Sequence, residues 1–400
     1  MKVLFYTREF PPYVYGGAGV HVEYLTAELS KLMHIEVRCF GDQKSTSKNL
    51  SIKGFPFEND MFDGSDDKLK TVFKTLSTCI NMNVDNVDAD LVHCHTWYAQ
   101  FAGILSKLCY GTPLVVTTHS LEPLRPWKRE QLGGGYDTSS WIEKTAIEMA
   151  DAIIAVSEET KNDVLAYFEV ESSKIHVIYN GIDLSEYTIT TESDVLDRFG
   201  IDKTKPFVLF VGRITKQKGI IYLVNAITHI DPEVQIVLCA GAPDTPEIAN
   251  QMINSVNLAK EERGNIIWID QMLDKKSVIQ LYSNADVFCC PSIYEPFGII
   301  NIEAMACETA VVASEVGGIK EVVVHGETGL LIPVEQQKNA PFEPKYPDKF
   351  SKDLANGINT LIKNDDLRKT MALNGRQRVE KHFSWESIAK QIESLYKTLV

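Results

Sequence analysis

The strongest constraint on the fold is a repeated alternation of short apolar runs with segments of helical periodicity. The apolar runs are mostly continuous and rich in Val and Ile, which is typical of parallel strands covered on both faces. In the first half of the chain the predicted strands are residues 3–7, 35–40, 91–95, 113–119, 152–157 and 174–180. The alternation then restarts, and the second set of predicted strands is residues 207–213, 235–241, 265–270, 286–292, 309–314 and 329–334.

A polar stretch at residues 183–194 separates the two sets. A chain of 400 residues also exceeds the size at which one core usually stops growing. We therefore predict an α/β protein with two doubly wound, Rossmann-like domains that face each other across a cleft. The first domain is expected at residues 1–190 and the second at 191–382. The amphipathic helix at 383–400 either caps the second domain or crosses back to the first.

The formal net charge of −14 argues against nucleic-acid and membrane partners. Both kinds of partner are usually bound by clusters of Lys and Arg. The first apolar run ends within a few residues, at Arg8, which fits a core strand and not a signal peptide. The cysteines form no C-x-x-C pair and lie mostly in apolar runs, so free buried thiols in a reducing compartment are expected. These features predict a cytoplasmic protein.

Two short motifs look like metal ligands but occur in unsuitable places. His93 and His95 alternate within a predicted strand, and no further ligand cluster accompanies them. Asp88 and Asp90 form a D-x-D pair, but they precede a buried strand and so lie at its amino end. We therefore expect no metal site, and no cofactor.

The most specific functional signal is residues 294–304, directly after the predicted strand 286–292. In doubly wound sheets, ligands bind beyond the carboxyl ends of the strands. Gly298 allows a ligand to approach the backbone closely. The N–H groups near Phe297 to Ile299 can then bind a phosphate or a sugar hydroxyl at a helix N-terminus.

Two glutamates belong to the same segment. Glu295 lies in the loop before the helix and is expected to face a sugar, whereas Glu303 lies about a turn inside the helix and can accept hydrogen bonds from a ribose. Taken alone, an exposed loop glutamate and a helix-surface glutamate would look the same. The full run is more specific than either residue.

A second signal is the turn at residues 212–219, which closes the predicted strand 207–213. Arg213 can bind a diphosphate bidentately, and Lys218 can act on it as a point charge. Both would stabilise the nucleoside diphosphate as negative charge develops on it. A solvated basic turn is the alternative, and we assign Lys216 to solvent.

Weaker signals occur in the first half. Gly17 belongs to a glycine-rich loop that departs from the dinucleotide fingerprint and fits a flexible lip near a phosphate. His119 ends an apolar strand, where a core histidine and a histidine that reaches the cleft are equally consistent. The loop that follows supplies the candidate acceptor-side residues Arg125, Trp127 and Lys128. An indole there can stack on a sugar ring and the cations can meet a phosphate, although a surface loop would also have this composition.

Together these segments resemble the two-domain (GT-B) retaining glycosyltransferases, specifically the bacterial glycogen synthases. The likeness runs over almost the whole chain, from YTREFPPYVYGGAGVHV and HCHTWY to VGRITKQKG, EPFGIINIEA and SEVGGIKEVV. The patterns E-x-F-G-(x4)-E and G-R-(x4)-K are specific to the wider superfamily. The stretch THSLEPLRPWK resembles the shorter branch of the family, which includes maltose-1-phosphate synthases.

The resemblance implies a retaining, metal-independent hexosyltransferase. It would move glucose from ADP-glucose or UDP-glucose to the 4-OH of an α-glucan, with glucose-1-phosphate as the alternative acceptor. The residues that match the family's motifs are Arg213 and Lys218 at the diphosphate, Glu295 beside the transferred glucose, Glu303 at the ribose, His119 near the donor sugar and Gly17 near the phosphates. One departure is that Tyr15 precedes Gly16, whereas the family's first motif usually begins with Lys-x-Gly-Gly.

Retention in glycosidases requires two carboxylates that flank the bond, and Glu295 has no evident partner acid. A front-face displacement, in which the leaving diphosphate takes the acceptor's proton, fits better. Three other functions stay open: a related transferase with a small-sugar or lipid acceptor, a non-catalytic sugar-nucleotide-binding regulator on the same fold, and an epimerase that acts on sugar nucleotides.

Overall fold

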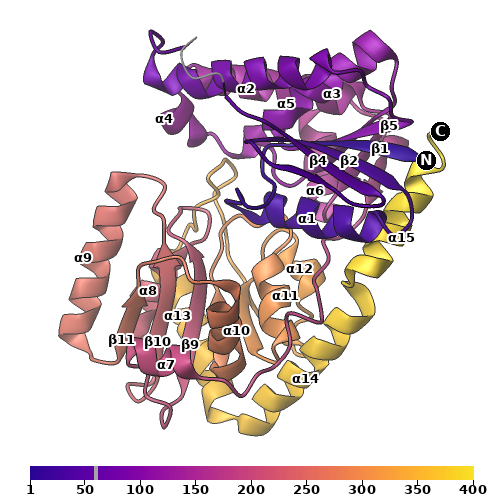
Figure 1. Cartoon of the computed structure of the whole chain (residues 1–400). Helices are drawn as coiled ribbons and strands as arrows, with labels where there is room; N and C mark the ends of the chain where they lie inside the picture. Colours follow the sequence, from indigo (N-terminus) through magenta and orange to yellow (C-terminus); the bar gives the residue numbers. More distant parts are fainter. Residues whose placement is uncertain (58–61) are drawn as a thin grey trace. The chain divides into compact units, whose positions relative to one another are not determined.

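The computed structural model describes residues 1–57 and 62–400. The described chain forms two compact units (Figure 1), and each has its own parallel sheet. The first unit is Met1–Gly181 together with Trp385–Val400, and the second is Ile182–Ser384. The first boundary therefore lies at Gly181 and not at residue 190, and the last helix belongs to the first unit.

The first unit contains a sheet with strand order β3-β4-β2-β1-β5-β6-β7-β8. Its strands are β1 Lys2–Thr7, β2 His34–Phe40, β3 Lys44–Thr46, β4 Leu50–Phe55, β5 Leu91–His95, β6 Leu114–Thr118, β7 Ala152–Ala155 and β8 Ile175–Val177. All neighbouring pairs are parallel except β3 with β4. Strands β3 and β4 were not predicted, because β3 is polar and exposed and β4 mixes apolar with polar residues that are mostly half-buried. Neither has the continuous apolar run of a covered strand.

The helices of the first unit are α1 Gly17–Leu29, α2 Asp67–Val84, α3 Trp97–Tyr110, α4 Lys128–Leu132, α5 Gly135–Met149, α6 Glu158–Tyr167 and α15 Trp385–Tyr396. Helix α15, yellow in Figure 1, lies beside the indigo α1, although the two are the last and the first helices of the chain. The ring of Trp385 stacks on Tyr24 and meets His21 edge-on. The apolar face of α15 thus packs against α1 and completes the core of the first unit.

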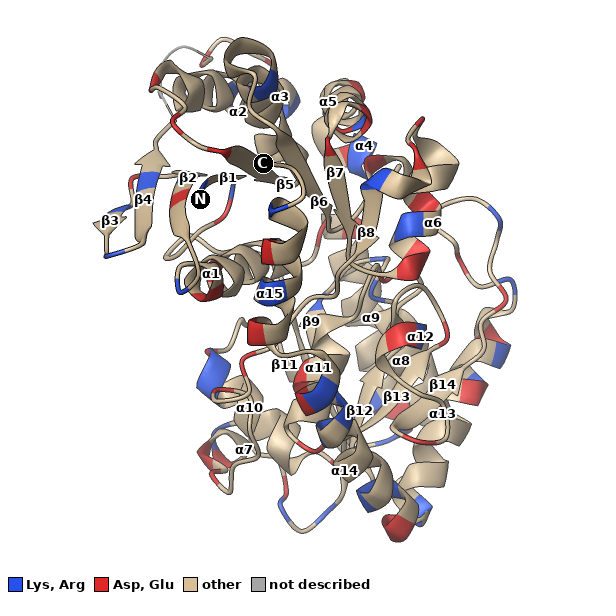
Figure 2. Ribbon diagram, turned by 90° about the vertical axis from the view of Figure 1, so that its right-hand side faces the viewer, with Lys and Arg blue, Asp and Glu red and all other residues tan. Residues whose placement is uncertain are grey.

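The second unit has strand order β11-β10-β9-β12-β13-β14. Its strands are β9 Phe207–Arg213, β10 Gln235–Gly241, β11 Ile266–Ile269, β12 Val287–Cys290, β13 Ala310–Ser314 and β14 Gly329–Ile332, and all neighbouring pairs are parallel. Its helices are α7 Asp194–Phe199, α8 Ile220–Ala226, α9 Pro246–Glu262, α10 Lys275–Asn284, α11 Ile299–Ala306, α12 Ile319–Val322, α13 Pro347–Lys363 and α14 Asp365–His382. In Figure 2 strands β12 and β13 are tan, and the blue and red that mark charged residues lie mainly on helices and loops.

The strand orders locate the place where a ligand is expected in each unit. In the second sheet the chain moves outward from β9 through β10 to β11, and then returns to the other side of β9 with β12. In the first sheet, β1 is flanked in the same way by β2 and β5. Such a reversal leaves a crevice at the carboxyl ends of the two central strands. The prediction of two doubly wound α/β units is confirmed.

Candidate active site

The structure brings Lys218 and Glu295 together at the carboxyl ends of β9 and β12. The Lys218 Nζ lies 2.6 Å from Glu295 Oε2, and the two side chains are only 18% and 9% exposed. Burial alone would lower the pKa of Lys218, but the neighbouring Glu295 carboxylate outweighs it and raises that pKa above its usual value. Lys218 is therefore a cation at neutral pH, as a diphosphate ligand must be.

Two glycines hold the loops that carry this pair. Gly219 has φ 61°, and a Cβ there would lie 2.0 Å from the carbonyl oxygen of Pro291. Gly317 has φ 49°, and a Cβ there would lie 2.1 Å from the carbonyl oxygen of Glu295. Both positions thus need a left-handed backbone and a residue without a side chain. The glycines bring neighbouring loops into backbone contact on either side of Glu295.

Arg213 ends β9, and Asp244 orients it. Its Nη1 donates a hydrogen bond of 3.1 Å to Asp244 Oδ1, and its side chain is 27% exposed. Its positive charge opposes protonation of Lys218, so the two cations are close enough to interact. Asp244 was not predicted, although it follows the carboxyl end of the neighbouring strand β10, and that position is a usable sequence signal.

Gly298 precedes α11 with φ 104°, in agreement with a turn that only glycine adopts readily. Phe297 is 2% exposed as a whole residue, and its ring packs edge-on against Phe383. Its side chain therefore belongs to the core of the second unit. Ile299 is the first residue of the helix, where N–H groups lack intrahelical acceptors.

Glu303 faces two tyrosine hydroxyls in the second unit. Tyr187 donates to Oε1 at 3.2 Å and Tyr282 donates to Oε2 at 3.1 Å. Burial raises the pKa of Glu303, and the two hydroxyls act against that rise. Sequence reasoning missed both tyrosines, because Tyr187 lies within the polar stretch 183–194 and Tyr282 lies inside a helix, and neither position is distinctive.

In the first unit, His119 belongs to a cluster of imidazoles. Its Nε2 lies 3.0 Å from the Nδ1 of His95, which ends β5. The ring of His21, on α1, meets His119 edge-on at 4.7 Å between centroids. Burial lowers the pKa of His21 to about 4 and lowers the pKa of His119 and His95 well below the usual value. His119 is therefore a neutral imidazole that donates or accepts hydrogen bonds.

The same cluster is the one place in the described residues where nitrogen ligands gather. One ring nitrogen from each of His21, His95 and His119 lies within 4.8 Å of the others. His93 takes no part, since its two ring nitrogens lie 2.6 Å and 2.7 Å from the hydroxyls of Tyr396 and Thr117. The His95–His119 distance is that of a hydrogen bond. Among the described residues, the Nε2 atoms of His21 and His95 are buried without a hydrogen-bond partner.

Gly17 is the first residue of α1, beside a carboxylate that already occupies this helix start. Oε2 of Glu9 accepts hydrogen bonds from the backbone N–H groups of Tyr15, at 2.9 Å, and Gly16, at 2.7 Å. Glu9 also packs against Gly19, where a Cβ would approach its side chain to 2.7 Å. The glycine-rich loop is thus ordered around Glu9, and only part of the helix start is open to a phosphate.

The predicted acceptor-side residues have different environments. Lys128 is 8% exposed and its Nζ lies 2.5 Å from Oε1 of Glu122, which is itself buried. The expectation that Lys128 meets an acceptor is therefore wrong for the structure, because its charge is enclosed and paired. Arg125 donates from Nη1 to Ser120 Oγ at 3.2 Å, and Trp127 is half-buried at the start of α4.

Comparisons with known proteins identify the family of the chain. A model described as "Glycosyltransferase Family 4" matches residues 15–186, and one described as "Glycosyl transferases group 1" matches residues 193–341. The chain is 44% identical to the α-maltose-1-phosphate synthase of Mycolicibacterium smegmatis and 42% identical to that of Mycobacterium tuberculosis, and each match covers 99% of both chains. The chain belongs to the GT-B glycosyltransferases.

Solved structures support this fold for the glycosyltransferase. The sucrose-phosphate synthase of Thermosynechococcus elongatus is 24% identical, with a TM-score of 0.81 over 100% of this chain and 98% of the other. At that identity the likeness concerns the fold alone.

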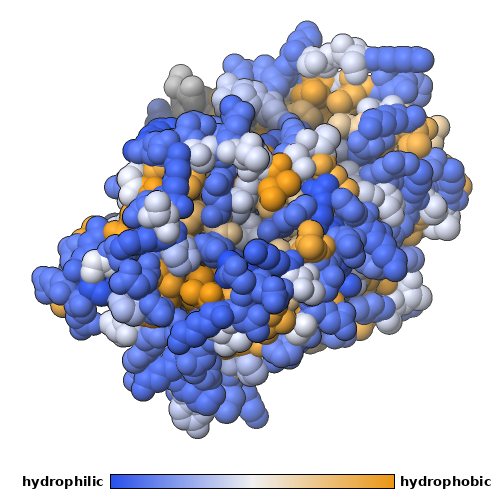
Figure 3. Space-filling model, turned by 90° about the horizontal axis from the view of Figure 1, so that it is seen from below, coloured by the Kyte–Doolittle hydropathy of each residue, from blue (hydrophilic) through white to orange (hydrophobic). Residues whose placement is uncertain are grey.

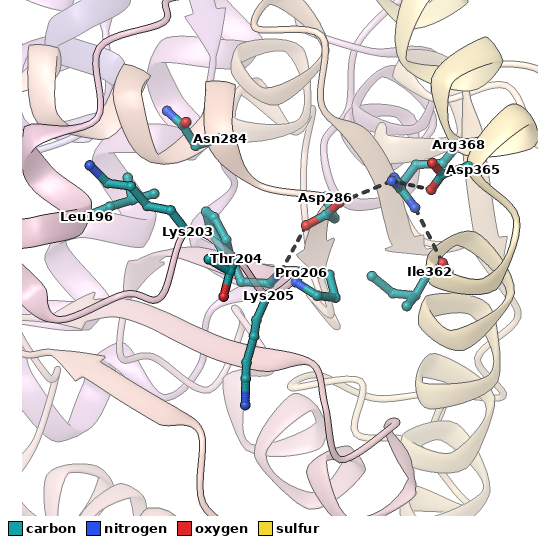
Figure 4. Close-up of a pocket in the computed structure, with 11 residues that line it drawn as sticks. Leu196, Lys203, Thr204, Lys205, Pro206, Asn284, Asp286, Ile362, Asp365 and Arg368 are labelled. Atoms are coloured by element: carbon teal, nitrogen blue, oxygen red, sulfur yellow. Dashed lines mark hydrogen bonds and ion pairs between the residues drawn. The ribbon is translucent and has the colours of Figure 1, made fainter.

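The pocket in Figure 4 lies away from the candidate donor site of the glycosyltransferase. This cavity of about 470 Å³ is at the amino ends of β9 and β12. Asp286 accepts the N–H of Phe207 at 2.9 Å and pairs with Arg368 at 3.2 Å, and Arg368 also pairs with Asp365 at 2.6 Å. Its most buried charges are thus already matched, at the edge opposite the carboxyl ends where doubly wound sheets bind ligands.

Hydrophilic side chains cover most of the face in Figure 3, and apolar residues form small separate groups there. Within residues 1–57 and 62–400, no helix is both long enough and apolar enough to cross a bilayer.

Proposed function

We propose that this glycosyltransferase transfers glucose, with retention, from ADP-glucose or UDP-glucose to the 4-OH of glucose-1-phosphate, and so forms α-maltose-1-phosphate. The observation that carries the proposal is the 44% identity to an α-maltose-1-phosphate synthase over 99% of both chains. This similarity favours glucose-1-phosphate over the α-glucan that we expected as the main acceptor.

The donor is assigned to the second unit. Lys218 and Arg213 would neutralise its diphosphate, and Glu303 would accept a ribose hydroxyl. Without a ligand, Lys218 is paired with Glu295 at 2.6 Å. A bound diphosphate would share the ammonium, and Glu295 would then accept a hydroxyl of the glucose.

The proposed step is a front-face displacement. The bond between C1 of glucose and the diphosphate oxygen breaks, and the acceptor 4-OH oxygen bonds to C1 from the same face. The acceptor's hydroxyl proton passes to the departing phosphate oxygen, and the electron pair of the broken bond stays on the diphosphate. Lys218 and Arg213 would stabilise the charge that develops there, so no metal ion or second carboxylate is needed.

An α-glucan is the second candidate acceptor, because the motifs shared with bacterial glycogen synthases do not select between the two. One experiment separates them. The protein is incubated with ADP-glucose or UDP-glucose, each with glucose-1-phosphate or glycogen, and the products are identified by mass spectrometry and by the anomeric coupling in NMR. We expect an α-linked disaccharide phosphate with one of the donors. Glucan extension alone, free epimerised sugar or no turnover in all four mixtures would contradict the proposal.

A further inference from the structure

The reversal of strand order in the first sheet brings two arginines to one place. Arg8 directly follows β1, and Arg125 lies in the loop after β6. Tyr98, in the first turn of α3 after β5, lies between them in strand order, because β5 separates β1 from β6. All three residues therefore come from the carboxyl edge at which a doubly wound sheet binds ligands.

Two of these side chains, those of Arg8 and Tyr98, are in direct contact. The guanidinium carbon of Arg8 lies 4.0 Å from the centroid of the Tyr98 ring, a close cation–π contact. Burial raises the pKa of the Tyr98 hydroxyl, and the positive charges of Arg8 and Arg125 both act against that rise. Arg125 is also tied to Ser120, the residue after His119, by the hydrogen bond from its Nη1.

The positive charge of the two arginines is not balanced. The carboxylate of Glu122 is taken by Lys128 at 2.5 Å. Glu143 is enclosed beside it, and burial raises its pKa well above the usual value, which favours its neutral form. Within residues 1–57 and 62–400, neither Arg8 nor Arg125 forms an ion pair, and the Nε of Arg125 is buried without a hydrogen-bond partner.

We propose that Arg8 and Arg125 bind the phosphate group of the acceptor and thereby select a sugar phosphate over a neutral glucan. The inference rests on the proposed function and names its specificity site. A guanidinium offers two parallel N–H donors that match the oxygens of a phosphate. A phosphate would also supply the acceptor that the buried Nε of Arg125 lacks, whereas a neutral glucan would leave the excess charge unmatched.

The test compares Arg8→Gln and Arg125→Gln with the control Arg129→Gln. Arg129 is a third arginine of the same region, but it is exposed and its Nη1 donates to Asp137 at 3.0 Å. We expect each of the first two variants to raise the KM for glucose-1-phosphate by about ten- to a hundredfold, as expected for a lost charged hydrogen bond. The KM for the sugar nucleotide, and all constants of the Arg129→Gln variant, should stay within twofold, roughly the scatter of near-neutral surface changes.

Arg8→Lys and Arg125→Lys show whether a rise in the KM comes from a loss of protein stability or from the loss of the bidentate guanidinium. Each keeps the charge but loses the bidentate geometry, so we expect an intermediate KM together with an unchanged unfolding midpoint. An unchanged KM for glucose-1-phosphate in both glutamine variants would overturn the inference. A selective rise in the KM for the sugar nucleotide would also overturn it, because the anion would then be the diphosphate of the donor.

Titration calorimetry with inorganic phosphate separates this inference from the proposed function. If the wild-type chain extends glycogen and forms no product from glucose-1-phosphate, the proposed function is wrong. Phosphate binding that is lost in Arg8→Gln would still support an anion site for the acceptor side, whereas absence of binding by the wild-type chain would overturn it. If glucose-1-phosphate is used equally well by all variants, the function stands and the site is refuted.

Discussion

At the scale of single residues, the environment of a charge decides whether it can act on a ligand. Lys218 and Lys128 are both largely buried and both paired with a glutamate. Lys218 lies at the strand reversal of its sheet, and its partner Glu295 is in a loop. Lys128 is paired with Glu122, whose Oε2 also accepts a hydrogen bond from Ser139 Oγ. The first pair can open to a ligand, and the second holds a loop together.

This difference gives a prediction for the donor site. Lys218→Ala should lower kcat by about a hundred- to a thousandfold, comparable to the loss of one donor that stabilises a developing anion. The control is Lys216→Ala, since Lys216 lies two residues earlier in the same turn with an exposed side chain. Single-turnover measurements at saturating ADP-glucose or UDP-glucose test both variants. An equal loss of kcat in both variants, or no loss of kcat in Lys218→Ala, would show that Lys218 has no specific role in the reaction.

At the scale of elements, the pairing of loops follows from topology. Lys218 and Glu295 are far apart in sequence, but each follows one of the two central strands of the second sheet, so the strand pattern alone was enough to expect them together. His119 and its partner His95 have the same signal, because they lie at the carboxyl ends of the neighbouring strands β6 and β5. The other partners, Glu122 of Lys128 and His21 of the imidazole cluster, had none. Glu122 forms a pair through a 3₁₀ turn, and His21 reaches His95 from a helix, so those contacts depend on local packing that periodicity does not encode.

The glycine turns are a testable part of this arrangement. Gly219→Ala should lower kcat/KM by about a hundredfold, because its Cβ would meet the Pro291 carbonyl at 2.0 Å and shift Lys218. Gly200→Ala is the matched control, since Gly200 has a similar φ of 69° but no heavy atom within 4 Å of a Cβ. Gly200→Ala should lose about 1–2 kcal/mol of unfolding free energy from backbone strain, and Gly219→Ala should lose more because of its clash with Pro291. Only the Gly219 variant should lose activity, and equal kinetics would show that the loop contact is unimportant.

At the scale of the whole molecule, the two ends of the chain belong to the same compact unit. The last helix, α15, belongs to the core of the first unit, and the Tyr396 hydroxyl lies 2.6 Å from the Nδ1 of His93 in β5. The chain enters the second unit at Ile182 and leaves it at Ser384, and these two residues form a parallel bridge. The end of the chain therefore completes the core of the first unit. Periodicity could not show this, because an amphipathic pattern marks a buried helix face but not the core against which that face packs.

Tyr396→Phe tests this dependence with one atom removed. Nδ1 of His93 would lose its partner while the ring stays buried, which should cost about 1–3 kcal/mol of unfolding free energy. Ser394→Ala is the control, because its exposed hydroxyl bonds only to the backbone of its own helix at 2.9 Å. Urea unfolding with amide exchange measures both variants. Protection should fall in β5 as well as in α15 for the Tyr396 variant. Exchange that rises in α15 alone would mean that the helix is attached to the first unit but does not share its stability.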